Sequence, residues 1–268
     1  MTDLLQPLLD DYLHDQGRLR VWSLIVTILG DTVETRQTTI PTTRLGLLLD
    51  RLGVSQAAQK TALSRLVKDG WAERSKEGRN TFYGFTDKGR EAFVPASRLV
   101  YAAPREEEPV HWLMAVSDDP RGVPIAPGIG LWPVDFAPRV RGFSVAGWID
   151  TLPGDLQVVT ADHQKETDIL TALLRYLEVT FSPDTKLDAL AARTVLIHRW
   201  RRYVLRHPEI PEKLAPEGWA GLTLRAKLGA AYWALTGSAE DWLQAPGDGF
   251  RALQIPGRAY WQRFGYQK

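Results

Sequence analysis

The chain has 268 residues, of which 44% are hydrophobic and 24% charged, and its formal net charge is +1. This is an ordinary globular composition, long enough for one to three domains, and a balanced total can still hide a local basic patch. The absence of cysteine excludes disulfides, thiolate metal sites and cysteine nucleophiles. The N-terminus is acidic, and the longest near-apolar run, Val21 to Gly30, is too short for a bilayer. We therefore expect a soluble cytoplasmic protein that does not enter the membrane.

The first 103 residues are predicted to form a mostly helical domain. Residues 21–29 are apolar on nearly every side, which indicates a buried helix. Thr42 or Thr43 is a suitable N-cap for the next helix, because a hydroxyl can accept a hydrogen bond from a free N–H group of the first turn. That helix is expected to end at Gly53, a residue type that often stops helices.

A third helix and a hairpin complete this domain. Ser55 is the expected N-cap of the helix, and Gly70 is expected to stop it. The strand-like runs 71–75 and 81–85 flank "KEGRN", which predicts a hairpin with a glycine-containing loop. A further helix is expected before the charged, proline-bounded linker "APREEEP".

Two more domains are expected after this linker. Residues 108–165 contain four short strand-like runs between Pro and Gly, which predict a small sheet domain: "VHWLMAVSD", "GIGLWPVDF", "GFSVAGWID" and "LQVVTAD". Residues 166–268 return to helical patterns and predict a helical C-terminal domain. Its helices are expected over residues 166–180, 189–206 and 222–235, the last stopped by Gly237, with Ser238 as the N-cap of a fourth.

The helix over residues 55–69 has two distinct faces at ~3.6 residues per turn. One face is apolar and consists of Ala58, Ala62, Leu63 and Leu66. The other is rich in hydrogen-bond donors and consists of Gln56, Lys60, Thr61, Ser64 and Lys68, with Arg65 on the flank. Gln can pair with adenine, and Lys or Arg with guanine or phosphate. Since Lys is common on any solvated helix face, the face favours DNA contact only together with its context.

That context is a helix, a short turn at Gly53-Val54, the polar helix and then a hairpin, which is the order of a winged helix-turn-helix. The predicted wing carries groups that a phosphate or a minor groove attracts: Arg74, Lys76, Arg79 and Asn80. Between residues 54 and 90, eight Lys or Arg stand against four Asp or Glu. We predict that these polar side chains, with Thr43 of the preceding helix, contact double-stranded DNA.

Two alternatives stay open for this segment: a winged helix that contacts protein, and a plain helical domain. Arg65 also has an alternative role, because it stands four residues before Asp69 and can form an i,i+4 ion pair with it. A direct base contact is therefore expected of Gln56 or Lys60 before Arg65.

A second basic segment is "RTVLIHRWRRYVLRHP", residues 193–208, which has five Arg, two His and no acidic residue. One interpretation is an amphipathic helix whose Arg side chains pair with acidic residues elsewhere or cap its own C-terminus. The others are an anion site, since a guanidinium binds phosphate in a bidentate way, and a dimer surface.

The sequence lacks the patterns of common enzymes. The five His residues form no HExxH or other metal-ligand spacing, and there is no GxSxG elbow or GxxxxGK[ST] phosphate loop. Asp118-Asp119 precedes Pro120 and is interpreted as an exposed turn, with a paired-carboxylate site as the alternative. We predict no catalytic residue, no metal site and no cofactor.

Several ordered segments together resemble the PaaX-type transcriptional repressors of phenylacetate catabolism. They are "VWSLIVTILGD", "ALSRLVKDGW", "GRNTFYGFTDKG", "ASRLVY" and "LIHRWRRYVLRHPEIPEKLAPEGWAG…AEDWL", and they cover the first hundred residues and about residues 190–243. The resemblance implies an α+β fold with an N-terminal winged helix-turn-helix at 1–103, a small middle domain similar to the ferredoxin-like Cas2 fold at 108–165, and a helical C-terminal domain at 166–268. It also implies a homodimer that binds operator DNA and releases it when an acyl-coenzyme A effector, phenylacetyl-coenzyme A, binds.

The middle domain departs from the family's pattern. Only "DDPRGVPIAP" separates the first two expected strands, which is too short and proline-rich for the helix of a Cas2-like fold, so a trimmed or irregular sandwich is expected. The effector is expected near the junction of the second and third domains, where it would contact His198, Arg199, Trp200, Arg201, Arg202, Tyr203 and Arg206. The rival functions are a winged-helix regulator with another effector, a protein-interaction module, and a Cas2-like nucleic-acid-processing enzyme.

Overall fold

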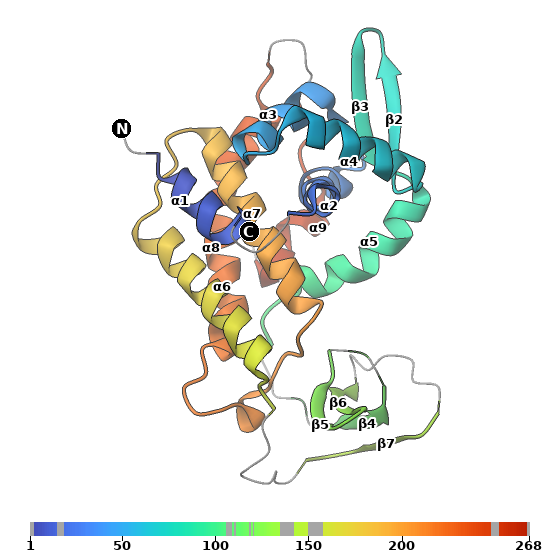
Figure 1. Ribbon diagram of the computed structural model, residues 1–268, viewed down its shortest axis with the longest axis vertical. Helices are drawn as coiled ribbons and strands as arrows, with labels where there is room; N and C mark the ends of the chain where they lie inside the picture. The colour runs from blue at the N-terminus through green and yellow to red at the C-terminus, as the bar shows by residue number, and fades with distance from the viewer. Residues whose placement is uncertain are drawn as a thin grey trace.

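The computed structural model describes residues 3–14, 19–105, 109, 111–117, 119, 121–134, 142–149, 158–247 and 252–266. Within these residues the chain is α+β, with helices in its N-terminal and C-terminal parts and two small antiparallel sheets (Figure 1). The second sheet lies below the helical body in that view, and the β2–β3 hairpin of the first sheet projects at the opposite end.

The predicted helices and hairpin of the N-terminal part occur in the expected order, with α1, η1, η2 and β1 in addition. They are α1 (Leu5–Leu9), the π-helix η1 (Asp10–His14), α2 (Val21–Thr32), η2 (Glu34–Arg36), β1 (Ile40–Pro41), α3 (Thr42–Arg51), α4 (Gln56–Lys68), β2 (Ala72–Glu77), β3 (Asn80–Phe85) and α5 (Asp87–Val100). The first sheet has the strand order β1-β3-β2. The buried helix expected over 21–29 is confirmed as α2, and Ser55 is confirmed as the N-cap of α4 because its side chain accepts from the Ala58 N–H.

The expected cap of α3 is wrong. Pro41 occupies the N-cap position, and no side chain caps the first turn. The Thr42 hydroxyl instead donates to the Thr81 carbonyl at 2.9 Å, which fastens the start of α3 to β3. Thr43 is exposed. β1 is two residues long and pairs with β3 through Ile40↔Tyr83. Because this pairing holds the start of α3 beside β3, the Thr42 hydroxyl bonds to Thr81 and does not cap α3.

The middle sheet consists of β4 (Trp112–Val116), β5 (Val123–Ala126), β6 (Ile129–Pro133) and β7 (Ser144–Gly147), in the order β5-β6-β4-β7. The segment read as a connection between the first two strands therefore contains a strand of its own, β5, which pairs with β6. Of the run "LQVVTAD", residues 156 and 157 lie outside the described residues, and the described part enters a helix at Ala161. One face of this sheet packs against Ile210, Leu214 and Trp219.

The C-terminal part is helical. Its elements are α6 (Ala161–Val179), α7 (Lys186–Val204), η4 (Glu212–Leu214), α8 (Gly221–Gln244), α9 (Arg258–Trp261) and η5 (Arg263–Gly265). The expected stop at Gly237 and the expected cap at Ser238 are wrong, because α8 runs through both residues without a break. Glycine inside a helix costs about 1 kcal/mol relative to alanine. Leu235, Ala239 and Leu243 on either side of Gly237 are buried, and their packing offsets this cost.

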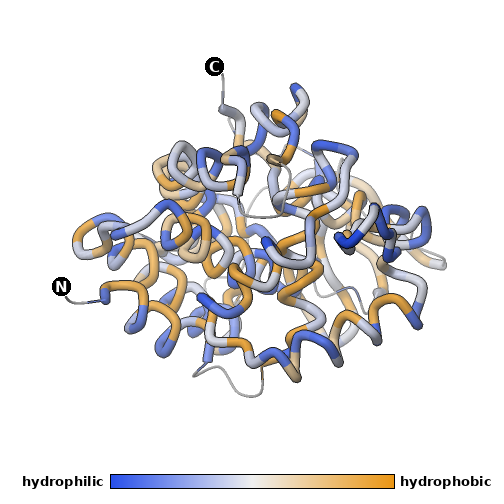
Figure 2. Tube along the Cα trace, turned by 90° about the horizontal axis from the view of Figure 1, so that it is seen from above, coloured by the Kyte–Doolittle hydropathy of each residue, from blue (hydrophilic) through white to orange (hydrophobic). Residues whose placement is uncertain are grey.

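One hydrophobic cluster joins helices from distant parts of the sequence. Leu24 and Ile28 of α2 belong to the same cluster as Leu196 of α7 and Leu228 of α8, and all four are fully buried. Viewed from above, apolar and polar segments alternate along the helices (Figure 2). The N-terminal helices α2 and α3 are thus packed directly on α7, and α4 packs in turn on α2 and α3. Among the described residues, no helix is both long and apolar enough to cross a membrane.

Candidate nucleic-acid interface

The turn between α3 and α4 is held by one side chain that the sequence did not single out. Gln59 is buried on α4, and its amide donates to Asp50 Oδ1 at 2.7 Å and to the Val54 carbonyl at 2.9 Å. Gly53 takes a positive φ of 74°, which residues other than glycine rarely adopt. These contacts fix α4 at a set angle to α3, so that the outer face of α4 is presented to solvent.

The eleven side chains predicted to contact DNA are all exposed: Thr43, Gln56, Lys60, Thr61, Ser64, Arg65, Lys68, Arg74, Lys76, Arg79 and Asn80. The opposite face of α4, with Ala62, Leu63 and Leu66, is buried as its apolar pattern predicts. A hollow of about 520 Å³ lies between the two helices and is lined by Thr43, Gln56 and Lys60 among others. The structure therefore brings Thr43 of α3 together with Gln56 and Lys60 of α4 at one hollow.

The hairpin projects from the body with its outer strand exposed. Every β2 residue after Ala72 is exposed, whereas Phe82 and Tyr83 of β3 are buried and anchor the hairpin. Pairing runs from Ala72↔Phe85 to Glu77↔Asn80, so the turn is only two residues long. Gly78 has a φ of 58° there, the conformation that a tight hairpin turn needs from its first residue.

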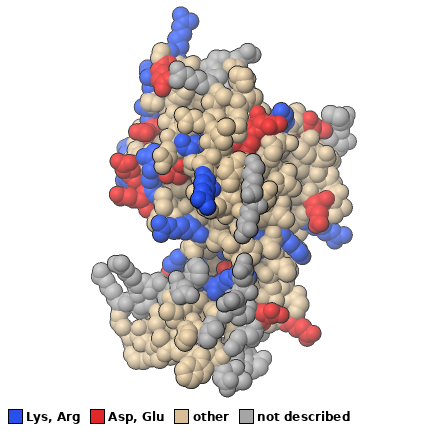
Figure 3. Space-filling model, turned by 180° about the vertical axis from the view of Figure 1, so that it is seen from behind, with Lys and Arg blue, Asp and Glu red and all other residues tan. Residues whose placement is uncertain are grey.

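Five basic side chains of α4 and the hairpin form no ion pair within the described part of the chain: Lys60, Lys68, Arg74, Lys76 and Arg79. Arg65 is different, because its Nε lies 3.5 Å from Asp69 Oδ2, and the i,i+4 pair expected from the sequence is confirmed. Figure 3 shows Lys and Arg side chains along the edge that carries the hairpin, with acidic side chains between them. These uncompensated charges are available to a polyanion.

The basic run of α7 is placed very differently. Arg199 is 1% exposed, and its Nη2 donates to Glu166 Oε2 at 2.9 Å. Arg201 donates to Ser23 Oγ at 2.6 Å, and the Trp200 indole N–H donates to the Val100 carbonyl at 2.7 Å. Three of the residues expected to contact the effector therefore link helices inside the protein.

The remaining members of that set divide between core and surface. His198 is buried and lies 3.0 Å from the Thr27 hydroxyl; burial, aided by the Arg201 and Arg202 charges, lowers its pKa to about 3. The Tyr203 hydroxyl lies 2.8 Å from His163 Nε2, and burial raises the pKa of Tyr203 to about 12. Arg202 is half-buried, and Arg206 is exposed and lies 3.3 Å from Asp162.

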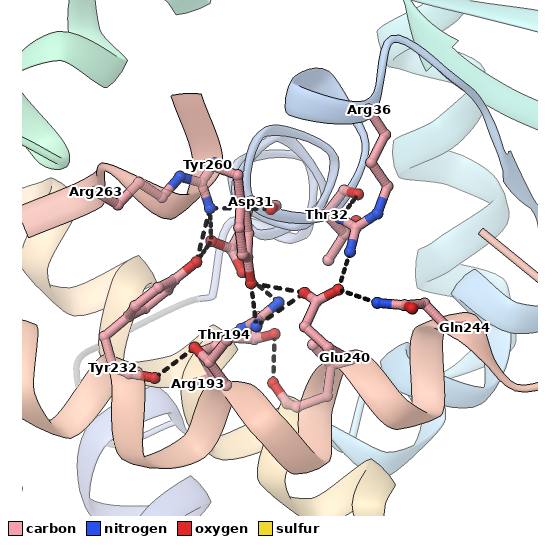
Figure 4. A network of polar contacts seen from close by, with 12 residues as sticks. Asp31, Thr32, Arg36, Arg193, Thr194, Tyr232, Glu240, Gln244, Tyr260 and Arg263 are labelled. Atoms are coloured by element: carbon pink, nitrogen blue, oxygen red, sulfur yellow. Dashed lines mark hydrogen bonds and ion pairs between the residues drawn. The ribbon is translucent and has the colours of Figure 1, made fainter. Parts of the chain in front are cut away.

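A buried network of charges joins α2 to the C-terminal helices (Figure 4). Arg193 of α7 lies 3.0 Å from Asp31 and 3.3 Å from Glu240, and Arg263 lies 2.7 Å from Asp31. Arg36 pairs with Glu240 from the other side. Burial alone would raise the pKa of the Asp31 carboxyl, but Arg193 and Arg263 outweigh it and hold that pKa below its ordinary value. The carboxylate therefore stays charged inside the protein.

Two further arginines fasten α3 to the C-terminal part. Arg44 is 1% exposed and donates to the carbonyls of Trp242 and Ala245 at the end of α8. Arg51, the last residue of α3, donates to Asp188 Oδ1 at 2.6 Å, and Asp188 belongs to the first turn of α7. Nothing in the local sequence distinguishes these two arginines from surface residues, because their partners lie far along the chain.

Of the two carboxylates considered from the sequence, Asp118-Asp119, the structure describes only Asp119. Asp118 lies outside the described residues. Asp119 Oδ1 accepts hydrogen bonds from the backbone N–H of Arg121 at 3.0 Å and from its Nε–H at 2.8 Å. These Arg121 contacts lower the pKa of Asp119. No group of three or more His, Asp or Glu residues that could hold a metal ion occurs in the described ranges.

The comparisons with known proteins agree with this geometry. A family model of PaaX-like proteins matches residues 20–89, and a model of the PaaX-like protein C-terminal domain matches residues 155–245. The Transcriptional repressor PaaX of Escherichia coli (strain K12) is 28% identical over 285 residues, covering 91% of this chain and 89% of that protein. The chain belongs to the PaaX family. The name of that relative describes a regulator of transcription, in agreement with the prediction that the chain is not an enzyme.

A solved structure shares the fold. The uncharacterized protein Rv0674 from Mycobacterium tuberculosis matches with a TM-score of 0.54 at 16% identity, over 82% of this chain and 99% of that one. At so low an identity, the likeness concerns the fold alone.

Proposed function

We propose that the chain is a transcriptional repressor of an aromatic-acid (phenylacetate) degradation operon, and that it binds operator DNA through a winged helix-turn-helix. The observation that carries this is the exposed set of five basic side chains on α4 and the hairpin that have no ion pair among the described residues. The α3–turn–α4 unit supplies the helix pair, α4 is the reader helix, and the β2–β3 hairpin is the wing.

The roles of these side chains follow from their chemistry. Gln56 and Lys60 line the hollow at the start of α4 and would contact base edges. Lys76 and Arg79, at the end of the hairpin, would contact phosphates and give the binding its salt dependence. A homodimer would place two such units on successive half-sites of a palindromic operator.

Release from DNA would require a ligand that binds the DNA-incompetent state more tightly, because only differential affinity shifts such an equilibrium. We propose an acyl-coenzyme A, phenylacetyl-coenzyme A in the first instance. Of the side chains of residues 198–206 expected to hold it, Arg201, Arg202 and Arg206 keep some access to solvent, while the buried members support the core.

A mobility-shift titration on the DNA upstream of the protein's own gene tests the DNA-binding proposal. The wild type should retard this DNA at low salt. The Lys76→Ala, Arg79→Ala double variant should bind more weakly, and its salt slope should be lower by about 1 for each lost phosphate contact. Lys165→Ala removes an exposed positive charge from α6 and is the matched control, with binding unchanged. No retardation by the wild type at low salt would rule out DNA binding.

A further inference from the structure

A cavity of about 590 Å³ lies between α6 and α8. Figure 1 shows α6 on the side of the helical body away from the β2–β3 hairpin. Its walls are apolar and include Leu174 and Leu177 of α6, Phe181 of the loop that follows, and Leu224 and Leu235 of α8. Sites for small molecules have volumes of ~300–1,000 Å³ and mostly apolar walls with a few polar groups. In size and lining, the cavity is suited to a small organic ligand.

The cavity exists because α8 presents small side chains at this point. Ala230, Ala231 and Ala234 line it on the α8 side, and Ala189 of α7 lines it at the far wall. Ala230 and Ala234 are exposed, so the cavity opens to solvent beside them, and larger aliphatic side chains at these positions would fill the space. Alanine is also the best helix former, so these positions keep α8 regular while leaving room beside it.

The mouth of the cavity carries charge. Arg175, Glu178 and Lys227 line it, and all three are exposed. None of the three forms an ion pair within the part of the chain that the structure describes. Two cations against one acid leave the rim positive, and it can therefore attract an anionic group while the apolar walls receive an uncharged one.

We propose that this cavity binds the apolar acyl or aryl end of an anionic ligand, with Arg175 and Lys227 at the rim contacting the anionic part. The assignment rests on the proposed function, since the ligand would be the acyl thioester effector of the repressor. It moves the effector site from the basic run of α7, whose buried members are held by other helices, to the space between α6 and α8.

A short path of contacts joins the cavity to α3. Ala189 in its wall follows Asp188, which accepts from Arg51 of α3 at 2.6 Å. Arg51 also lies 2.8 Å from Asp3. On α6, the Tyr176 hydroxyl donates to the Leu4 carbonyl at 2.7 Å. A ligand that moves α6 or the start of α7 thus acts on the contacts that position the first helix of the helix-turn-helix.

Isothermal titration calorimetry on the 268-residue chain tests the assignment, with phenylacetyl-coenzyme A and, separately, coenzyme A as the ligands. Coenzyme A should bind at least about tenfold more weakly, because it lacks the apolar group; a tenfold change in Kd corresponds to about 1.4 kcal/mol. Ala234→Trp, at an exposed position in the wall, should fill the cavity and weaken thioester binding at least about tenfold. Ala172→Trp, an exposed α6 position outside the lining, should leave it unchanged.

A second pair of variants tests the rim. The Arg175→Gln, Lys227→Gln double variant should weaken thioester binding several-fold, whereas Lys165→Gln should not. Unchanged affinity in both Ala234→Trp and the double variant, equal affinity for coenzyme A, or no thioester binding by the wild type would each overturn the assignment. A mobility shift without ligand separates the two proposals: if the wild type binds thioester at this cavity but retards no DNA, the proposed function fails and the binding site stands.

Discussion

Two helices of this chain, α4 and α7, are rich in basic residues, and the structure uses them in opposite ways. On α4 the charges face solvent, and Lys60 and Lys68 have no ion pair within the described residues. On α7 the most buried charges, Arg193 and Arg199, are 0% and 1% exposed and are paired with acidic residues of other helices.

The difference shows which of the two basic helices is able to bind a charged partner. A charge at the surface keeps its hydration and can exchange it for a phosphate. A buried charge costs several kcal/mol in desolvation, which only a well-placed partner offsets, and its hydrogen-bonding groups are then committed to that partner. Arg193 and Arg199 are therefore part of the core's structure, whereas Lys60 and Lys68 of α4 are open to a ligand.

Removing one partner from the buried network should have the largest effect on stability. Asp31→Asn leaves Arg193 and Arg263 with less compensating charge and should lower the free energy of unfolding by about 3–5 kcal/mol. Urea denaturation followed by circular dichroism measures the change. Asp162→Asn, which breaks the exposed pair with Arg206, is the control and should change stability by less than about 1 kcal/mol. Similar losses in both variants would contradict the distinction between paired core charges and surface charges.

The pH dependence of stability should report on the same core. Burial lowers the pKa of His163 to about 4 and that of His198 to about 3, from an ordinary value of 6.5. As the pH falls below 6.5, the unfolded chain takes up protons that the folded chain cannot bind, so the free energy of unfolding should fall by a few kcal/mol by about pH 4.5. The Asp31 carboxylate adds little in this window, because its stabilising contribution is lost only as the pH falls through the ordinary pKa of 3.8 toward its lowered pKa.

Chemical denaturation between pH 8 and pH 4.5 measures this effect. His198→Gln keeps a hydrogen-bonding side chain near Thr27 but cannot take up a proton, so its stability should depend less steeply on pH than that of the wild type. His111→Gln, at an exposed position, is the matched control and should keep the wild-type slope. A slope unchanged in His198→Gln would mean that His198 binds protons equally in both states.

What the sequence predicted well depends on local patterns. The two faces of α4, its cap at Ser55 and the pairing of β2 with β3 follow from periodicity and turn residues within about thirty positions. The exposure of the whole predicted DNA-contacting set follows from the same patterns.

What it missed depends on partners far along the chain. Arg193 was one of five arginines in an acid-free run, and its partners Asp31 and Glu240 lie 162 and 47 residues away. The continuity of α8 through Gly237 likewise depends on its packing against α7, which local propensity does not contain. The alanines that leave the α6–α8 cavity open are, in the sequence alone, indistinguishable from ordinary helix formers.

The smallest expected effect concerns Arg65, the α4 cation that resembles the α7 arginines in having a partner. Its side chain is 67% exposed and its pair with Asp69 spans 3.5 Å, so Arg65→Ala should cost only about 0.3 kcal/mol of stability. It should also change operator affinity by less than about twofold, whereas Lys60→Ala should weaken it about tenfold, as expected for a lost base contact. Paired mobility-shift titrations of the two variants measure both affinities. A larger loss of operator affinity for Arg65→Ala than for Lys60→Ala would contradict this prediction. It would show that a surface ion pair does not prevent a basic side chain from binding DNA, because Arg65 can leave the exposed Asp69 for a phosphate.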